Sequence, residues 1–147
     1  MTTTAKKVGS LLTPAFTIAD LVAGEIDVSG TVTAGSLEPY GDIRIQIDPS
    51  ANPAVGDILL DVYLIRTINS VQEDYDINDN AEGFLPAGAY VGSCIANDAA
   101  DHTAKDYIIR DVELPPAGFK VGVKNRDSTG LSAAPVMNIS PWQYETT

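Results

Sequence analysis

This chain has very few of the residues on which most enzymes and metal sites depend. Its 147 residues include one cysteine, one histidine and one tryptophan. A single cysteine excludes an intrachain disulfide, so the fold must be held together by packing. One histidine and one cysteine in unrelated contexts fall short of the ligand set of a zinc site. No phosphate-binding glycine loop is present either, and we expect neither catalysis nor a bound cofactor.

Basic residues are scarce as well. Nine Lys and Arg stand against 20 Asp and Glu, which gives a formal net charge of -11 at pH 7. Binding to nucleic acid or to an anionic membrane needs clustered basic side chains, so neither is an expected partner. No apolar run approaches the roughly 18 residues of a membrane helix, and residues 8–12 are too short and too polar for a signal-peptide core. We therefore expect synthesis in the cytoplasm.

The sequence does contain many short stretches in which apolar and polar residues alternate. Ile43, Ile45 and Ile47, for example, alternate with polar residues, as in a strand with one buried face. Such stretches recur about every ten residues with turn residues between them, and no amphipathic helix is evident. The pattern predicts an all-β protein, an antiparallel β-sandwich or jelly roll of about seven or eight strands. Residues 17–147 would form this domain, and residues 1–16 an extended N-terminal arm.

Three of the expected β segments carry more specific predictions. Residues 110–124 read as strand, tight turn and strand, with Pro-Pro-Ala-Gly at the turn, and predict a hairpin. Residues 58–68 are almost continuously apolar, which indicates a central strand covered on both faces or a strand at a subunit interface. Cys94 lies in the expected strand 89–96, and we expect its thiol to be buried and unreactive.

The strongest acidic cluster lies in residues 73–83. Asp74, Asp76 and Asn78 have the spacing of the first three ligands of a calcium loop. The loop pattern then fails, because Asp79 stands where the motif has glycine and the glutamate at its last position is missing. A solvated acidic loop is therefore favoured over a Ca²⁺ site, for which Asp74, Asp76, Asn78 and Asp79 are the candidate ligands.

His102, the only histidine, lies beside Asp101 in an expected turn. A Ser-His-Asp triad would have to use it, but the chain has no Gly-x-Ser-x-Gly elbow. The nearest serine, Ser93, falls within an expected strand. A surface histidine is favoured over a catalytic one, and we predict that the protein is not an enzyme.

Four residues near the two ends of the sequence are candidates for contact with a partner. Lys6 and Lys7 of the arm would meet carboxylates of that partner, unless the arm is a disordered tail. Trp142 and Tyr144 are the aromatic residues most expected to be exposed. Because exposed aromatic rings also stack on sugars, a carbohydrate-binding or adhesion module of a phage tail or another surface assembly remains the alternative function.

An ordered set of short segments resembles a family of small virion proteins of tailed bacteriophages. The set spans most of residues 17–144, and its closest matches are residues 86–93 and 110–121. The resemblance implies a β-sandwich that works as a cement or decoration protein on the capsid surface. It further implies binding to the major capsid protein, often as a homotrimer, no catalytic residues, and a place in the virion. The other matching segments are residues 17–24, 62–67, 74–75, 129–133 and 141–144.

Overall fold

The computed structural model describes residues 4–18, 21–34, 38–68, 71–72, 89–97, 104–116 and 118–146. Within these ranges the regular secondary structure is almost all β-strand. None of the described segments is a helix long and apolar enough to cross a membrane. The strands are β1 (Thr4–Val8), β2 (Ile26–Val28), β3 (Tyr40–Ile47), β4 (Ile58–Ile68), β5 (Val71–Gln72), β6 (Tyr90–Ile95), β7 (Lys105–Glu113), β8 (Phe119–Asn125) and β9 (Val136–Thr146).

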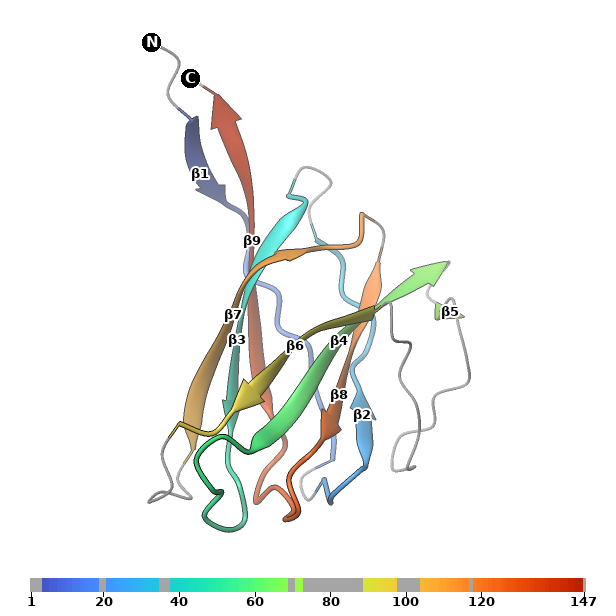
Figure 1. Ribbon diagram of the computed structural model, residues 1–147. Helices are drawn as coiled ribbons and strands as arrows, with labels where there is room; N and C mark the ends of the chain where they lie inside the picture. The colour runs from blue at the N-terminus through green and yellow to red at the C-terminus, as the bar shows by residue number, and fades with distance from the viewer. Residues whose placement is uncertain are drawn as a thin grey trace.

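The strands form two antiparallel sheets, packed face to face (Figure 1). Sheet A has the order β1-β9-β3-β7. Sheet B has the order β2-β8-β4, and both β6 and the two-residue β5 pair with the far side of β4. With β5 set aside, consecutive strands change sheets at every connection except the one between β4 and β6. This is the connectivity of a jelly roll, so the predicted all-β sandwich is confirmed.

Alternating side chains from the two sheets meet in one core. Ile43, Ile45 and Ile47 of β3 are completely buried, as their alternation predicts. Sheet B covers them from the other side with side chains of its two central strands. These are Leu60, Val62 and Leu64 of β4 and Phe119, Val121 and Val123 of β8.

β4 is a central strand that is covered on both faces. It lies between β8 on one side and β6 on the other. While alternate residues enter the main core, Ile65 packs with Ile26, Val28 and Tyr63 in a second, smaller cluster. Of the two alternatives for this apolar segment, coverage within one chain is therefore the one observed.

The predicted hairpin over residues 110–124 is wrong. Both strands exist and alternate as expected, with Val112 and Phe119 buried. However, β7 pairs with β3 in sheet A, whereas β8 pairs with β2 and β4 in sheet B. Pro115 is buried at the crossing and has no N–H to offer to a ladder, so the segment bridges the two sheets instead of turning within one.

The extended N-terminal arm is not confirmed as a separate element. β1 pairs antiparallel along its whole length with the end of β9, and Leu12 and Phe16 then pack against the core. All five residues of β1 are exposed. Together, β1 and residues 142–146 project beyond the sandwich as two paired strands (Figure 1), which we call the terminal ribbon.

A proline marks the point where the terminal ribbon leaves the sandwich. Pairing of β1 with β9 stops at Val8 and resumes only at Leu12. Between them the N–H of Gly9 donates to the carbonyl of Pro141 at 2.7 Å. In an antiparallel strand, the N–H and C=O of one residue point toward the same neighbouring strand. The C=O of Pro141 points toward the N-terminal segment, but proline has no N–H that could pair with this segment at the break.

Substitutions in sheet A test the assigned burial. Ile45→Ala should lower the free energy of unfolding by about 2–5 kcal/mol, because it leaves a cavity in the core. Ile108→Ala is the control, since Ile108 is 54% exposed on the same sheet and should cost about 1 kcal/mol or less. Urea denaturation followed by circular dichroism measures both, and equal losses would contradict the described packing.

Candidate functional site

Three of the four residues predicted to contact a partner lie together at the base of the terminal ribbon. Lys6 stands opposite Tyr144 in the pairing of β1 with β9, and Trp142 stands opposite Tyr40 of β3. Asp42, two residues further along β3, lies on the same outer face of sheet A. We call Lys6, Tyr40, Asp42, Trp142 and Tyr144 the aromatic cluster.

The three rings of the aromatic cluster pack closely. Tyr40 stacks on Trp142 with ring centroids 4.8 Å apart, and Tyr144 meets Trp142 edge-on at 5.0 Å. The Lys6 ammonium lies 4.2 Å from the centre of the Trp142 ring, within the range of a cation–π contact. As a result Trp142 is only 2% exposed while Tyr144 is 63% exposed. The expectation of an exposed ring is therefore wrong for Trp142 and confirmed for Tyr144.

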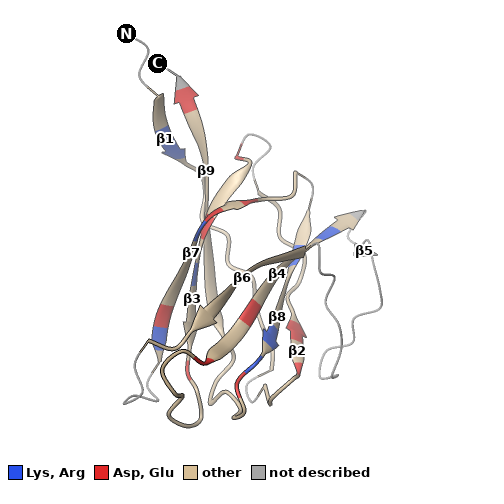
Figure 2. Ribbon diagram, viewed as in Figure 1, with Lys and Arg blue, Asp and Glu red and all other residues tan. Residues whose placement is uncertain are grey.

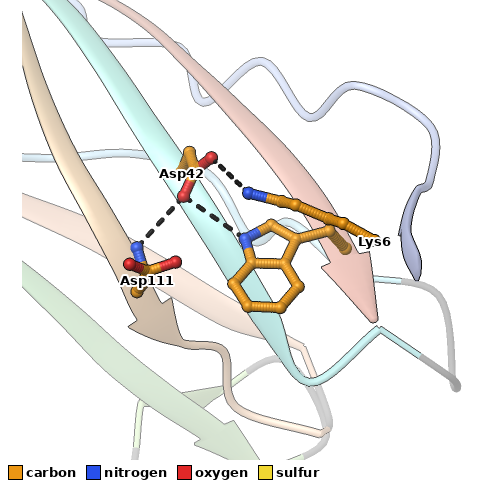
Figure 3. A network of polar contacts seen from close by, with 4 residues as sticks. Lys6, Asp42 and Asp111 are labelled. Atoms are coloured by element: carbon orange, nitrogen blue, oxygen red, sulfur yellow. Dashed lines mark hydrogen bonds and ion pairs between the residues drawn. The ribbon is translucent and has the colours of Figure 1, made fainter. Parts of the chain in front are cut away.

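Asp42 connects three strands at this point (Figure 3). Its Oδ2 accepts a hydrogen bond from the Lys6 ammonium of β1 at 2.7 Å. Its Oδ1 accepts the backbone N–H of Asp111 in β7 at 3.0 Å and the indole N–H of Trp142 in β9 at 3.3 Å. One carboxylate thus fixes the ribbon, the last strand and an irregular part of β7.

That irregularity is a β-bulge at Asp111. The register of β3 with β7 shifts between Gly41 and Ile43, and Asp111 has φ of 56°, in the left-handed region that few residues other than glycine adopt. A bulge leaves a backbone donor outside the ladder, and here Asp42 accepts it. Beyond the bulge Val112 and Glu113 still pair with β3, and the chain then leaves sheet A for the crossing to β8.

The charges around Asp42 favour its ionised form. Burial acts to raise the pKa of the Asp42 carboxyl, but hydrogen bonds from Lys6, from the Asp111 N–H and from Trp142, with the Lys6 charge, hold the pKa below its ordinary value of 3.8. On the opposite face of the ribbon, Lys7 pairs with Glu145 at 2.6 Å. The hydrogen bond to Glu145 and the charge of Glu145 raise the pKa of Lys7. Both lysines therefore already have a carboxylate partner within the chain.

A second polar group lies on sheet B. The Ser93 hydroxyl donates to Asp61 Oδ1 at 2.5 Å, and the Tyr90 hydroxyl lies 2.7 Å from the same Ser93 oxygen. Arg126 Nε lies 3.5 Å from Asp61 Oδ2. Since Asp61 is only 8% exposed, these contacts satisfy a nearly buried carboxylate, and no imidazole from the described residues joins them.

Cys94 lies in β6 with its thiol turned into the core. Its side chain is 1% exposed, and burial, with a smaller effect of the Asp61 charge, raises the pKa of the thiol to about 12. At neutral pH the reactive thiolate is then a negligible fraction. The prediction of a buried, unreactive cysteine agrees with this environment.

The structure does not describe the remaining candidate residues from the sequence. The calcium candidates Asp74, Asp76, Asn78 and Asp79 and the single histidine, His102, lie outside the described residues. In the parts of the chain that the structure describes, no three His, Cys, Asp or Glu side chains gather closely enough to hold a metal ion. Comparisons of the chain with protein-family models, with curated proteins and with solved structures found no match.

Two residues of the aromatic cluster were missed from the sequence. Alternation along β3 places Tyr40 and Asp42 on the outer face, opposite the buried isoleucines, and this part could have been foreseen. Their position beside Trp142 comes from the pairing of β3 with β9, which joins segments about a hundred residues apart. Local pattern carries no signal for that pairing.

The role of Asp42 can be tested through its titration. Its folded-state pKa is depressed, so its ionised form stabilises the fold above about pH 4, and this contribution is lost as the pH falls through the folded-state pKa. Asp42→Asn should therefore lower the free energy of unfolding by about 1–2 kcal/mol near neutral pH, with a difference from wild type that shrinks as the pH falls through the folded-state pKa of Asp42.

Asp106→Asn is the matched control for this measurement. Asp106 pairs with Arg44 at 2.6 Å on the same sheet face, but both side chains are largely exposed, so its loss should cost about 0.5 kcal/mol or less. Urea titrations at a series of pH values give both profiles. A difference for Asp42→Asn that stays constant from neutral to acid pH would contradict the assigned role.

Proposed function

We propose that this chain is a non-enzymatic docking protein, and in particular a decoration or cement protein of a tailed-phage capsid. The observation that carries the proposal is the aromatic cluster at the base of the projecting ribbon. Tyr144 is exposed, but its ring rests against Trp142, which Tyr40 and Lys6 hold in place. A pre-packed aromatic side chain loses little conformational freedom on binding, and such residues often dominate interfaces.

A second apolar side chain extends this surface. Val8 of β1 is 60% exposed and stands opposite Trp142, diagonal to Tyr144 on the same face of the ribbon. Two exposed apolar side chains on a projecting element form a surface that a partner would cover. A two-stranded ribbon is marginal by itself, so contact with a partner would also stabilise the ribbon.

The kind of partner follows from the fold and from the sequence resemblance. Jelly rolls occur in viral capsid proteins and in lectins, so the fold suggests these two functions by analogy alone. The resemblance to phage virion proteins favours the former, with the major capsid protein as partner, the virion as location and a homotrimer as the bound form. A protein that binds assembled capsids in preference to free subunits stabilises the assembly by mass action, and a trimer adds avidity.

The carbohydrate-binding alternative rests on the exposed ring of Tyr144. Sugar stacking through Trp142 is disfavoured, because Tyr40 and Lys6 leave the indole almost without exposed surface. Both functions therefore depend on Tyr144, and the identity of the ligand separates them.

Tyr144→Ala tests the docking surface directly. It should weaken binding to undecorated heads of the same virus at least about tenfold, since it removes the exposed anchor, while the unfolding midpoint stays close to wild type. Val136→Ala is the control, because Val136 is 56% exposed on the same strand and far from the cluster. Co-sedimentation with heads measures binding. Equal affinities of the two variants would contradict the proposal, and glycan-array binding lost in Tyr144→Ala would select the sugar-binding alternative.

The oligomeric state gives a second, independent test. Multi-angle light scattering should show a mass about three times the 15.5 kDa of one chain. A homotrimer presents three copies of the aromatic cluster to a capsid, which is the source of the expected avidity. A monomer at all concentrations would contradict the trimer and favour a single-site binding module.

A further inference from the structure

The edge strands of the two sheets differ in how they are protected. Unpaired backbone at a sheet edge is a template for another strand, and proteins blunt it with charges, prolines or short length. In sheet A, β1 carries Lys6 and Lys7, and β7 carries five charged residues. In sheet B, β2 has three residues. β6, by contrast, has six residues with neither a charge nor a proline, and Figure 2 shows it without any charged position.

We propose that the outer edge of β6 accepts an extended segment of another protein, which continues sheet B by strand addition. Among the strands that the structure describes, β6 pairs with β4 alone. Tyr90 and Ile95, at its two ends, are 48% and 52% exposed. Ile109 of β7 lies under the middle of β6, since a Cβ added to Gly92 would come within 3.1 Å of its side chain. The edge is thus uncharged and backed by β7 of the other sheet.

A cleft of about 260 Å³ adjoins the beginning of this edge. It opens beyond the bulge at Asp111, where the chain leaves sheet A after Glu113. Its lining residues are Leu64, Arg66, Ala89, Tyr90, Val91, Val112, Glu113, Leu114 and Pro115, and most of its exposed wall is polar. In strand addition, main-chain hydrogen bonds supply affinity and a neighbouring pocket selects a side chain. With Arg66 and Glu113 in its wall, the cleft would take a polar side chain of the added segment.

Charge identifies the occupant as a different protein with basic flanks. The sequence before β6 contains five acidic residues within residues 73–82, and Asp98 and Asp101 follow it. The net charge of -11 disfavours a second copy of the chain, because two copies of the same acidic protein repel each other. It favours a segment with an apolar centre and Lys or Arg at both ends.

This inference goes beyond the proposed capsid function. The β6 edge belongs to sheet B, whereas the aromatic cluster lies on the outer face of sheet A. A substitution that disrupts one surface leaves the other intact, so the two proposals can be tested separately.

A pair of synthetic peptides tests the proposal on the full chain. The probe is Lys-Lys-Leu-Thr-Val-Thr-Val-Lys-Lys, and its counterpart has Glu in place of every Lys. The basic peptide should slow amide exchange of β6 residues at least about tenfold, read by NMR, because their free N–H groups become hydrogen-bonded. The acidic peptide should bind at least about tenfold more weakly. This comparison needs no variant, so it does not depend on the folding of a mutant.

Two lysine substitutions locate the binding edge. Ile95→Lys places a charge on β6 and should weaken binding of the basic peptide at least about tenfold. Ile108→Lys makes the same change on β7 at nearly equal exposure, 54% against 52%, and should change binding less than about twofold.

Several results would overturn the inference. These are the absence of binding by the basic peptide, equal binding of the two peptides, protection of β1 or β7 amides in place of those of β6, and equal effects of the two substitutions. Dimerisation of the chain that disappears in Ile95→Lys would assign the edge to a second copy and overturn the choice of occupant.

Discussion

The packing of β3 against β4 across the core is the contact on which the rest of the structure depends. The isoleucines Ile43, Ile45 and Ile47 of β3 share one core with Leu60, Val62 and Leu64 of β4, and all of these side chains are buried. Each contributes about 1.5–3 kcal/mol by burial. All other long strands are placed by these two, since β9 and β7 flank β3 while β8 and β6 flank β4. Both surfaces proposed for binding are therefore built on strands that the core holds in position.

Asp42 is the link between this core and the candidate site. It lies on β3, one residue before the buried Ile43, so its backbone is fixed by the core. Its carboxylate then reaches outward to Lys6, to Trp142 and to the bulge at Asp111. The same group thus positions the exposed ring of Tyr144 through Trp142 and the end of β7 that borders the cleft beside β6. A neutral residue in place of Asp42 would not form the ion pair with Lys6 that attaches β1 to this link.

Much of the fold follows from the sequence, because a strand with one buried face is a local pattern. The alternation of Ile43, Ile45 and Ile47 and the apolar run of β4 predicted both central strands correctly. The hairpin failed for a physical reason: Pro115 and its neighbours indicate that the chain bends, but not whether it bends within a sheet or between two sheets. The exposure of Trp142 failed similarly, since its cover comes from Tyr40 and Lys6, which are distant in sequence. Partners across a jelly roll are non-local, and a single sequence does not reveal them.

The pairing of β1 with β9 has a consequence for the order in which the protein can be completed. During synthesis β1 leaves the ribosome long before its partner in sheet A exists, because residues 142–146 lie well over a hundred residues later in the sequence. At about 5–20 residues per second, β1 waits for several seconds with an unpaired edge. Lys6 and Lys7 carry charge on that edge throughout the interval and discourage pairing with other nascent chains. We therefore expect the two lysines to limit such pairing of β1 during translation, before they form their ion pairs in the folded protein.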